Sequence, residues 1–235
     1  MLDLEKRVGL DLDPKYEGIL TQNFLDYIPT PAKTYLSVGN PPFGKISSTA
    51  IKFFNKCAEF SNVIAFIIPR TFRRVSVQNK LNLHFKIIHD ETLSTKPCCF
   101  SPNMSAKCCF QIWVRDDINI RSKVLYSRFH PDFEFVKLGP KDVNGQPTPP
   151  IAHFALKAYG SNCGSIQEVN LEKLRPKSWH WIKANIDVNT LKINFSKIDY
   201  SMSKNTVRQD SLGQQDLIHL SYNTKNTTCT KKVKV

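Results

Sequence analysis

Residues 34–69 read TYLSVGNPPFGKISSTAIKFFNKCAEFSNVIAFIIP, and their pattern decides the fold. Two short apolar runs, Thr34 to Gly39 and Val63 to Pro69, have the length of buried strands. The segment between them carries apolar residues at helical spacing behind a cap at Ser47 or Ser48, namely Ile51, Phe54, Cys57 and Ala58. Strand, helix and strand in this order predict a parallel pair with a helix on one face.

The flanking segments extend this pattern in both directions. RVGLDLD (7–13) predicts a strand before it, and VSVQNKLNLHF (75–85) predicts a helix after it. Three strand-like segments follow without a helical period between them, namely KIIHDE, KCCFQIWV and KVLYSRF. They are typical of an antiparallel edge rather than of further strand–helix units. The expected fold class is α/β, a mostly parallel Rossmann-like sheet with an antiparallel edge strand.

A loop rich in proline and glycine, GPKDVNGQPTPP (139–150), predicts a domain boundary. We therefore expect a core domain over residues 1–138 and a smaller α+β extension over 139–222. The tail 223–235 is basic and poor in large apolar residues, which predicts disorder.

Charge indicates a polyanionic partner. Against 20 Asp and Glu the chain has 33 Lys and Arg, a net charge of +13, which favours nucleic acid first and an anionic membrane surface second. A basic soluble protein without such a partner is the alternative. No apolar run approaches the roughly 20 residues that cross a bilayer, and the start MLDLEKR lacks the order of a secretory signal.

Cysteine usage bears on the compartment and on metals. Seven cysteines, an odd and scattered set, fit a reducing compartment better than a disulfide framework. The two Cys-Cys doublets suggest zinc, but adjacent cysteines on a strand point in opposite directions, so buried apolar roles are favoured and no metal is expected. Together with the start of the chain, this predicts an intracellular protein, in the cytoplasm or the nucleus.

The loop SVGNPPFGK (37–45) is compatible at first with two chemistries. From Gly39 it is one residue short of a P-loop, which aims backbone N–H groups at phosphates and follows its lysine with a hydroxyl. Here Pro41 and Pro42 remove two of those donors, and Ile46 stands in the place of the hydroxyl. The phosphate-binding interpretation therefore fails.

The same prolines suit the binding of an exocyclic amine. They stiffen the loop, so that the side-chain oxygen of Asn40 and the carbonyl of Pro41 can accept two hydrogen bonds from one NH2 group. Phe43 offers a face on which a flipped-out base can stack. Such a site directs the lone pair of the nitrogen toward a methyl donor, and positioning supplies most of the catalysis.

At these residues the chain resembles class I S-adenosylmethionine-dependent methyltransferases that act on the N6 amino group of adenine, over roughly residues 5–115. The resemblance implies a methyl donor, S-adenosylmethionine, and a nucleic-acid substrate, DNA before RNA. It implies that Asp11, at the end of VGLDLDP, binds the ribose hydroxyls of the donor. Asn23 and Phe24, in ILTQNFLDY, would lie against its adenine, where the family more often has Asp in place of Asn23. The catalytic residues would be Asn40, Pro41, Pro42 and Phe43.

Three arginines follow the strand VIAFIIP, whose sequence with its proline turn, VIAFIIPRTF, also resembles the family. Arg70, Arg73 and Arg74 are expected at the sheet edge where ligands of open α/β sheets bind, and we predict that they contact phosphates. Each site residue also has a structural alternative: a solvated strand end for Asp11, a turn and core pair for Asn23 and Phe24, a structural turn for residues 40–43, and a solvated helix start for the arginines.

The first strand of the family and its glycine-rich loop have no counterpart here. That strand lies between the second and the fourth, so its omission removes a central strand and leaves two ladders unpaired. We expect that the chain is a fragment or that its start was assigned too late; direct pairing of other strands is the alternative. A partner chain could also supply the strand.

Two other functions remain open at this level: a noncatalytic nucleic-acid-binding remnant or partner subunit, and a methyltransferase for protein glutamine. C-terminal segments such as YGSNCGSI and WHWIKANI resemble, more loosely, those of phage-like and virus-like members. They are compatible with a phage or viral protein whose extension is a target-recognition subdomain.

Overall fold

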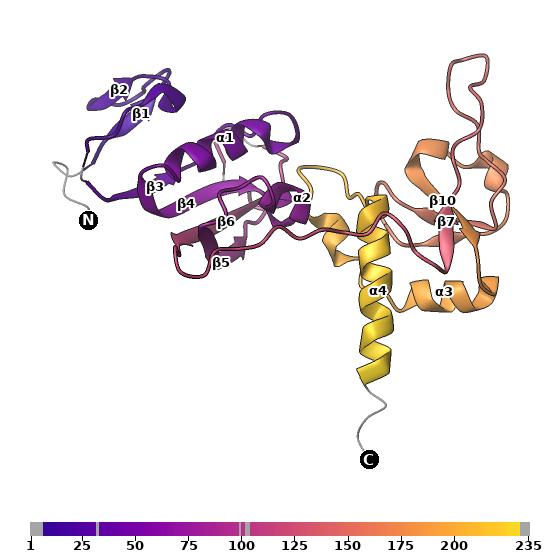
Figure 1. The fold of residues 1–235 in the computed structure, drawn as a ribbon. Coiled ribbons are helices and arrows are strands. Elements are labelled where there is room, and N and C mark those ends of the chain that lie inside the picture. The colour runs from indigo at the N-terminus through magenta and orange to yellow at the C-terminus, as the bar shows by residue number, and fades with distance from the viewer. Residues whose placement is uncertain (1–6, 32, 99, 102–103, 231–235) are drawn as a thin grey trace. The chain divides into compact units, whose positions relative to one another are not determined.

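The computed structural model of the chain describes residues 7–31, 33–98, 100–101 and 104–230, with side chains up to residue 224 (Figure 1). It consists of two compact units. Unit 1 comprises residues 1–104 and 108–123, and unit 2 comprises 105–107 and 124–235. The sequence predicts a boundary between residues 138 and 139, whereas the structure divides the chain between 123 and 124. The boundary comes earlier because β7 (Phe133–Phe135) pairs with β10 (Trp179–Ala184) inside unit 2.

Unit 1 is built on a four-stranded sheet in the order β3 (Tyr35–Gly39), β4 (Ser61–Pro69), β6 (Cys108–Arg115), β5 (Phe85–Thr92). The β3–β4 pair is parallel, as expected, and β6 runs antiparallel to both of its neighbours. The antiparallel strand therefore lies inside the sheet and not at its edge, which corrects the prediction. Its sequence, CCFQIWVR, is the more apolar, whereas the charged residues of β5 are better solvated at an edge.

The N-terminal strands β1 (Gly9–Asp11) and β2 (Ile19–Thr21) form a separate two-stranded parallel sheet. A short 3-10 helix, η2 (Phe24–Asp26), follows, and the ring of Phe24 packs on that of Phe53 with centroids 5.0 Å apart. Within the described residues, neither β1 nor β2 pairs with β3. The sheet thus does not close by direct pairing of these strands.

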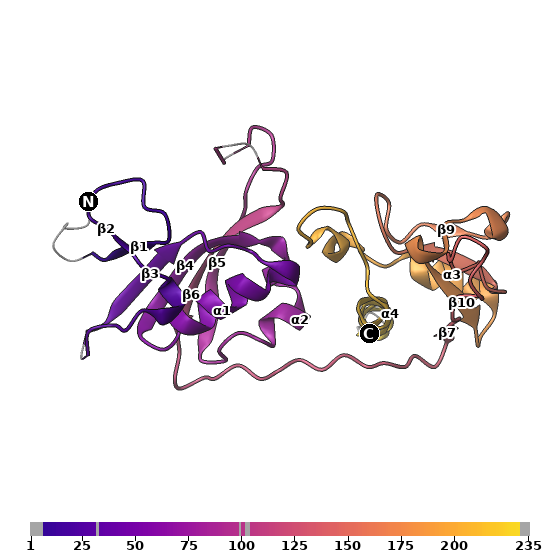
Figure 2. The same cartoon turned by 90° about the horizontal axis from the view of Figure 1, so that it is seen from above.

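Helix α1 (Ser48–Cys57) covers one face of the four-stranded sheet of unit 1, at the place that its apolar spacing predicts (Figure 2). Its buried side chains are those of Ala50, Ile51, Phe54 and Cys57. Phe54 is fully buried and makes edge-on or tilted contacts, with centroids 5.3 to 6.5 Å apart, to Phe66, Phe72, Phe85 and Trp113. These rings form the centre of the core of unit 1.

The next helix is shorter than the sequence predicts. After η4 (Arg70–Arg73), α2 covers only Val75–Gln78 instead of residues 75–85. Asn55 of α1 accounts for the early end, because its side chain donates to the carbonyl of Lys80 and accepts from the backbone N–H of Asn82. Those bonds replace the intrahelical ones, and the chain turns into β5.

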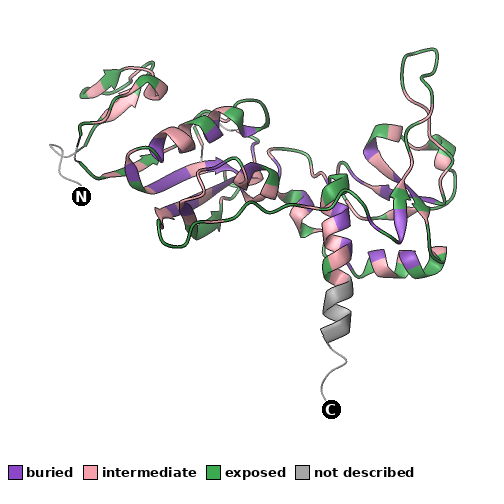
Figure 3. Ribbon diagram, in the orientation of Figure 1, coloured by how far each residue is buried: buried purple, intermediate pink, exposed green. Residues whose placement is uncertain are grey.

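Unit 2 has an all-antiparallel sheet in the order β7, β10, β8 (Phe154–Lys157), β9 (Ile166–Gln167). Its core lies between this sheet and the helices α3 (Val188–Ser196) and α4 (Gln214–Thr230), with short 3-10 turns η5 (Leu171–Lys173), η6 (Pro176–Ser178) and η7 (Ser201–Lys204) in between. Figure 3 shows the buried residues of each unit gathered on its own strands and helices.

Two predictions for the C-terminal half are corrected. KVLYSRF (123–129) is irregular rather than a strand, and its apolar residues Val124 and Leu125 are exposed. Residues 223–230, predicted to be disordered, continue α4, while 231–235 lie outside the described residues.

The fold is therefore α/β with mixed sheets. In the described part of the chain, no helix has the length and apolar character to cross a membrane.

Candidate active site

The loop after β3 carries the residues predicted to be catalytic. Asn40 directly follows the last strand residue and is exposed, whereas Pro41 is buried and Phe43 is half-buried. The carbonyl of Phe43 accepts a hydrogen bond of 3.4 Å from the N–H of Ala50 in α1. The two prolines and this hydrogen bond restrict the conformation of the loop. Among the described residues, the side-chain amide of Asn40 makes no hydrogen bond, so it is available to a ligand.

A second loop reaches the same edge of the sheet. Because β3 and β4 are parallel, their carboxyl ends coincide, and η4 begins directly after Pro69. The hydroxyl oxygens of Ser47 and Thr71 lie 2.6 Å apart and join the two loops, and Ser47 is fully buried. The hydroxyl of Ser47 is thus used between loops, and it makes no capping bond to α1.

The backbone between Asn40 and α1 is unusual. η3 (Lys45–Ser47) contains Ile46 at φ 52°, ψ 42°, and Ser47 follows at φ 59°. A left-handed conformation costs about 1–2 kcal/mol for a residue with a Cβ and is rarer still for a β-branched one. Gly44, at φ 68°, has no room for a Cβ, which would lie 2.2 Å from the Thr49 hydroxyl oxygen. Contacts to neighbouring elements therefore determine the shape of this loop.

Two of the predicted phosphate-binding arginines, Arg70 and Arg73, bond to the neighbouring strands. Arg70 donates to the carbonyls of Leu93 (3.1 Å) and Cys108 (3.3 Å). Arg73 donates to both carboxylate oxygens of Asp90, its Nε lying 2.9 Å from Oδ2, and this bond raises the pKa of its guanidinium. Arg70 and Arg73 thus anchor η4 to β5 and β6, and phosphate contact stays a prediction for all three arginines.

The residues predicted to bind the donor occupy turns. The carboxylate of Asp11 is exposed at the end of β1 and accepts from the N–H of Asp13 at 2.9 Å. Asn23 caps η2 by accepting from the N–H of Leu25 at 3.1 Å. Phe24 packs against α1, as described above. The structure thus brings Phe24 to the flank of the helix that follows the loop predicted to be catalytic, but within the described residues it shows no hydrogen bond from Asp11 or Asn23 to that loop.

The outer edge of β3 has no partner strand within the described residues. Leu36 and Val38, on the sheet face opposite α1, are 52% and 68% exposed. The register places further apolar residues on the same face, all buried or half-buried, namely Val63, Ala65, Ile67, Phe110, Ile112 and Val114. Of these eight residues only Leu36 and Val38 are exposed, so the apolar surface open to solvent lies along the outer edge of β3.

We expect Val38→Lys to reduce self-association of the purified chain without lowering its melting temperature. An unpaired apolar edge promotes sheet-to-sheet association, a lysine there opposes it, and Val38 has little burial to lose. Light scattering against concentration measures the effect, with Ile151→Lys, at a more exposed apolar site in unit 2, as the control. Equal scattering of the wild type and Val38→Lys would contradict it.

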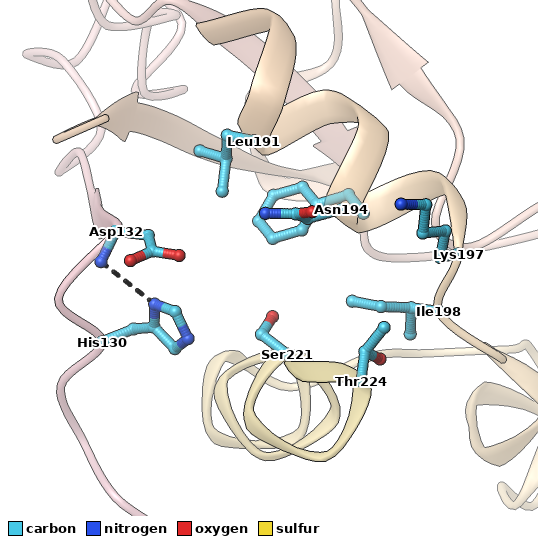
Figure 4. A pocket seen from close by; sticks show the side chains of 9 residues that line it. His130, Asp132, Leu191, Asn194, Lys197, Ile198, Ser221 and Thr224 are labelled. Atoms are coloured by element: carbon cyan, nitrogen blue, oxygen red, sulfur yellow. Dashed lines mark hydrogen bonds between the residues drawn. The ribbon is translucent and has the colours of Figure 1, made fainter. Parts of the chain in front are cut away.

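A cluster in unit 2 escaped the sequence-based predictions. A cavity of about 30 Å³ is lined by His130, Asp132, Ser221 and residues of α3 and α4 (Figure 4). The Nδ1 atom of the His130 ring accepts from the N–H of Asp132 at 3.2 Å, and the ring stacks on Phe133. The sequence signal that could have pointed to this cluster is the HPD tripeptide at residues 130–132. The volume of the cavity suits a water molecule and is too small for a nucleobase.

A second, open groove in unit 1 is lined by Lys86, Ile88 and residues 114–118. It includes the carboxyl end of β6 and the amino end of β5, and therefore lies at the sheet edge opposite Asn40. In open α/β sheets, ligands bind outside the carboxyl ends of the parallel strands, so the groove is not where a substrate is expected.

Burial makes two of the described cysteines, Cys57 and Cys109, unreactive. Cys57, Cys98, Cys108, Cys109 and Cys163 are free thiols, and burial raises the pKa of Cys57 to about 11 and that of Cys109 to about 12. A thiol with so high a pKa is a poor nucleophile and a poor metal ligand at neutral pH. Groups of three or more potential metal-ligating side chains do not occur in the described residues.

Comparison of the chain with protein-family models, with curated proteins and with solved structures finds no match.

Proposed function

We propose that the chain carries the catalytic loop of an S-adenosylmethionine-dependent methyltransferase that acts on the N6 amino group of adenine in DNA. One observation carries this proposal: Asn40 stands exposed at the carboxyl end of the parallel strand β3, held there by a buried proline. That is the position at which open α/β sheets bind their ligands.

The loop would act by positioning the substrate amine. The Asn40 side-chain oxygen and the Pro41 carbonyl would each accept one hydrogen bond from the NH2 group, which turns the nitrogen lone pair out of the ring plane. The nitrogen would attack the methyl carbon of the donor, so that the N–C bond forms as the S–C bond breaks and S-adenosylhomocysteine leaves, and the amine proton would then pass to solvent. The half-buried Phe43 provides the face on which the base can stack.

S-adenosylmethionine would supply an electrophilic methyl group. The residues available on this chain fit its nucleoside in part. The exposed carboxylate of Asp11 has the acceptor oxygens that ribose hydroxyls require. The side-chain oxygen of Asn23 is engaged in capping η2, so Phe24 and Asp11 are the stronger candidates of the three.

The proposal includes a further strand between β1 and β3. Both strands belong to unit 1, each pairs in parallel with a neighbour, and the edge of β3 has no partner in the described residues. A parallel strand in that place would join the two sheets and bring the carboxyl ends of β1 and β3 to one edge, with Asp11 and Asn40 beside each other. A partner polypeptide is one source of such a strand.

The test is methyl transfer with and without the Asn40 amide. We expect Asn40→Ala to lower incorporation of labelled methyl groups into unmethylated DNA by about 100-fold or more, the range seen when one preorganised hydrogen bond to a reacting group is lost. Donor binding, measured by calorimetry, should be unchanged. Asn62→Ala, an exposed asparagine at the other end of β4, is the matched control. Full activity of Asn40→Ala would overturn the proposal.

A second candidate is a noncatalytic nucleic-acid-binding protein or methyltransferase subunit. Within the described residues no strand joins β1, which carries Asp11, to the edge of β3, and this favours the candidate because the donor site would be incomplete. This candidate predicts DNA binding that weakens steeply with salt while the donor does not bind. Detectable donor binding by this chain alone excludes it.

A further inference from the structure

The loop between Asn40 and α1 exposes an apolar side chain at a conformational cost. Ile46 is 73% exposed, although it is β-branched and adopts a left-handed backbone conformation. Burial of the Ile46 side chain therefore does not offset the conformational free energy of the left-handed backbone. Contacts on either side maintain it instead: the buried Ser47 is bonded to Thr71, and Gly44 is packed against Thr49. The exposed position of Ile46 thus lowers the stability of the fold, and backbone strain of this kind is concentrated at functional sites.

The neighbours of Ile46 indicate what it meets. Lys45 is exposed beside it, and Asn40 lies six residues earlier, within about 20 Å of extended chain. Ile46 is thus an apolar side chain beside the cation of Lys45 and near Asn40, whose amide is proposed to bind a base. A nucleic-acid duplex has a chemical group that suits each of the three. Phosphates pair with the cation, and apolar side chains such as Ile enter between bases and unstack them.

We propose that Ile46 is a wedge that enters the duplex and occupies the space of the base drawn toward Asn40, while Lys45 contacts the adjacent phosphate. This inference rests on the proposed function, because it takes duplex DNA as the substrate. It adds a residue that opens the helix to the residues that hold the amine. A preformed, strained loop suits the task, since the wedge need not be ordered when it binds.

Mismatched DNA provides a test that does not require the target sequence. A wedge must unstack bases, and unstacking costs less at a mismatch. We expect the wild type to bind a short duplex with one A·C mismatch roughly 10-fold more tightly than the paired duplex. Ile46→Gly should bring this ratio close to one, and its melting temperature should stay the same or rise, because glycine adopts the left-handed conformation freely.

Two further variants separate the roles. Ile118→Gly, at a site 92% exposed in the same unit, should leave the ratio unchanged. Lys45→Ala should weaken binding to both duplexes equally and reduce its salt dependence. A ratio near one for the wild type, an unchanged ratio in Ile46→Gly, or a lower melting temperature in Ile46→Gly would each overturn the wedge.

The outcomes distinguish this inference from the proposed function. If methyl transfer depends on Asn40 while the mismatch ratio ignores Ile46, the wedge is wrong and the methyltransferase stands. If the ratio depends on Ile46 and no methyl transfer occurs, the wedge stands on a noncatalytic DNA-binding protein.

Discussion

Phe54→Ala is expected to destabilise unit 1 by about 3–5 kcal/mol, the range for a large aromatic residue removed from a packed core. Phe54 is fully buried, and four other aromatic rings pack around it. Alanine would leave a cavity that rings from three different strands and η4 would have to close together. Since single domains are stable by only about 5–15 kcal/mol, this one change removes a large part of the stability of the unit.

Hydrogen exchange resolved by mass spectrometry measures this effect in each unit separately. Peptides from β4 and β6 should lose protection in Phe54→Ala, whereas peptides from β8 and β10 should not, because they belong to unit 2. Phe129→Ala, at a site 65% exposed, is the matched control and should change neither set by more than about 0.5 kcal/mol. Unchanged protection of β4 would show that Phe54 is not central to this core.

Gly164→Ala should have the largest effect of any single methyl group added to unit 2. Gly164 adopts φ 96°, and a Cβ there would lie 2.3 Å from the ring of Tyr200. That ring cannot move freely, because its hydroxyl donates to the carbonyl of Phe195 at 3.0 Å. We expect about 1–2 kcal/mol from the left-handed backbone and about 1–3 kcal/mol from overpacking.

Gly160 separates these two contributions. Its φ of 91° is nearly the same, but a Cβ there would meet nothing within 4 Å, so Gly160→Ala should lose only the backbone part. Denaturant unfolding of the two variants gives the difference directly. In a double-mutant cycle with Tyr200→Ala, the coupling free energy between the two positions should equal the overpacking part. Equal destabilisation by Gly164→Ala and Gly160→Ala would rule out the clash.

The sequence alone was sufficient for the segment that contains the candidate site. Apolar runs of strand length and the helical spacing of Ile51 and Phe54 predicted β3, α1 and β4, and the structure confirms all three. These signals are local, since each residue meets neighbours a few positions away. The same holds for the place of Asn40 at the carboxyl end of a strand. The chemistry assigned to that loop stays a prediction.

Features that depend on distant residues could not be predicted in this way. Arg73 is paired with Asp90, seventeen positions away on a strand whose neighbours only the folded sheet determines, and this pair was not predicted. The shorter α2 depends likewise on Asn55. The boundary between the units depends on β7, whose three residues carry little local signal until β10 lies beside them.

The stretch 34–69 thus determined a parallel strand–helix–strand unit with an asparagine at the carboxyl end of its first strand, because periodicity and proline stiffness act within a few residues. Only the tertiary structure decided that β6 lies inside the sheet, that the outer edge of β3 has no partner in the described chain, and that Ile46 is left-handed and exposed. Each of these results from contacts between residues far apart in the chain, such as Ser47 with Thr71, whose energies no local pattern contains.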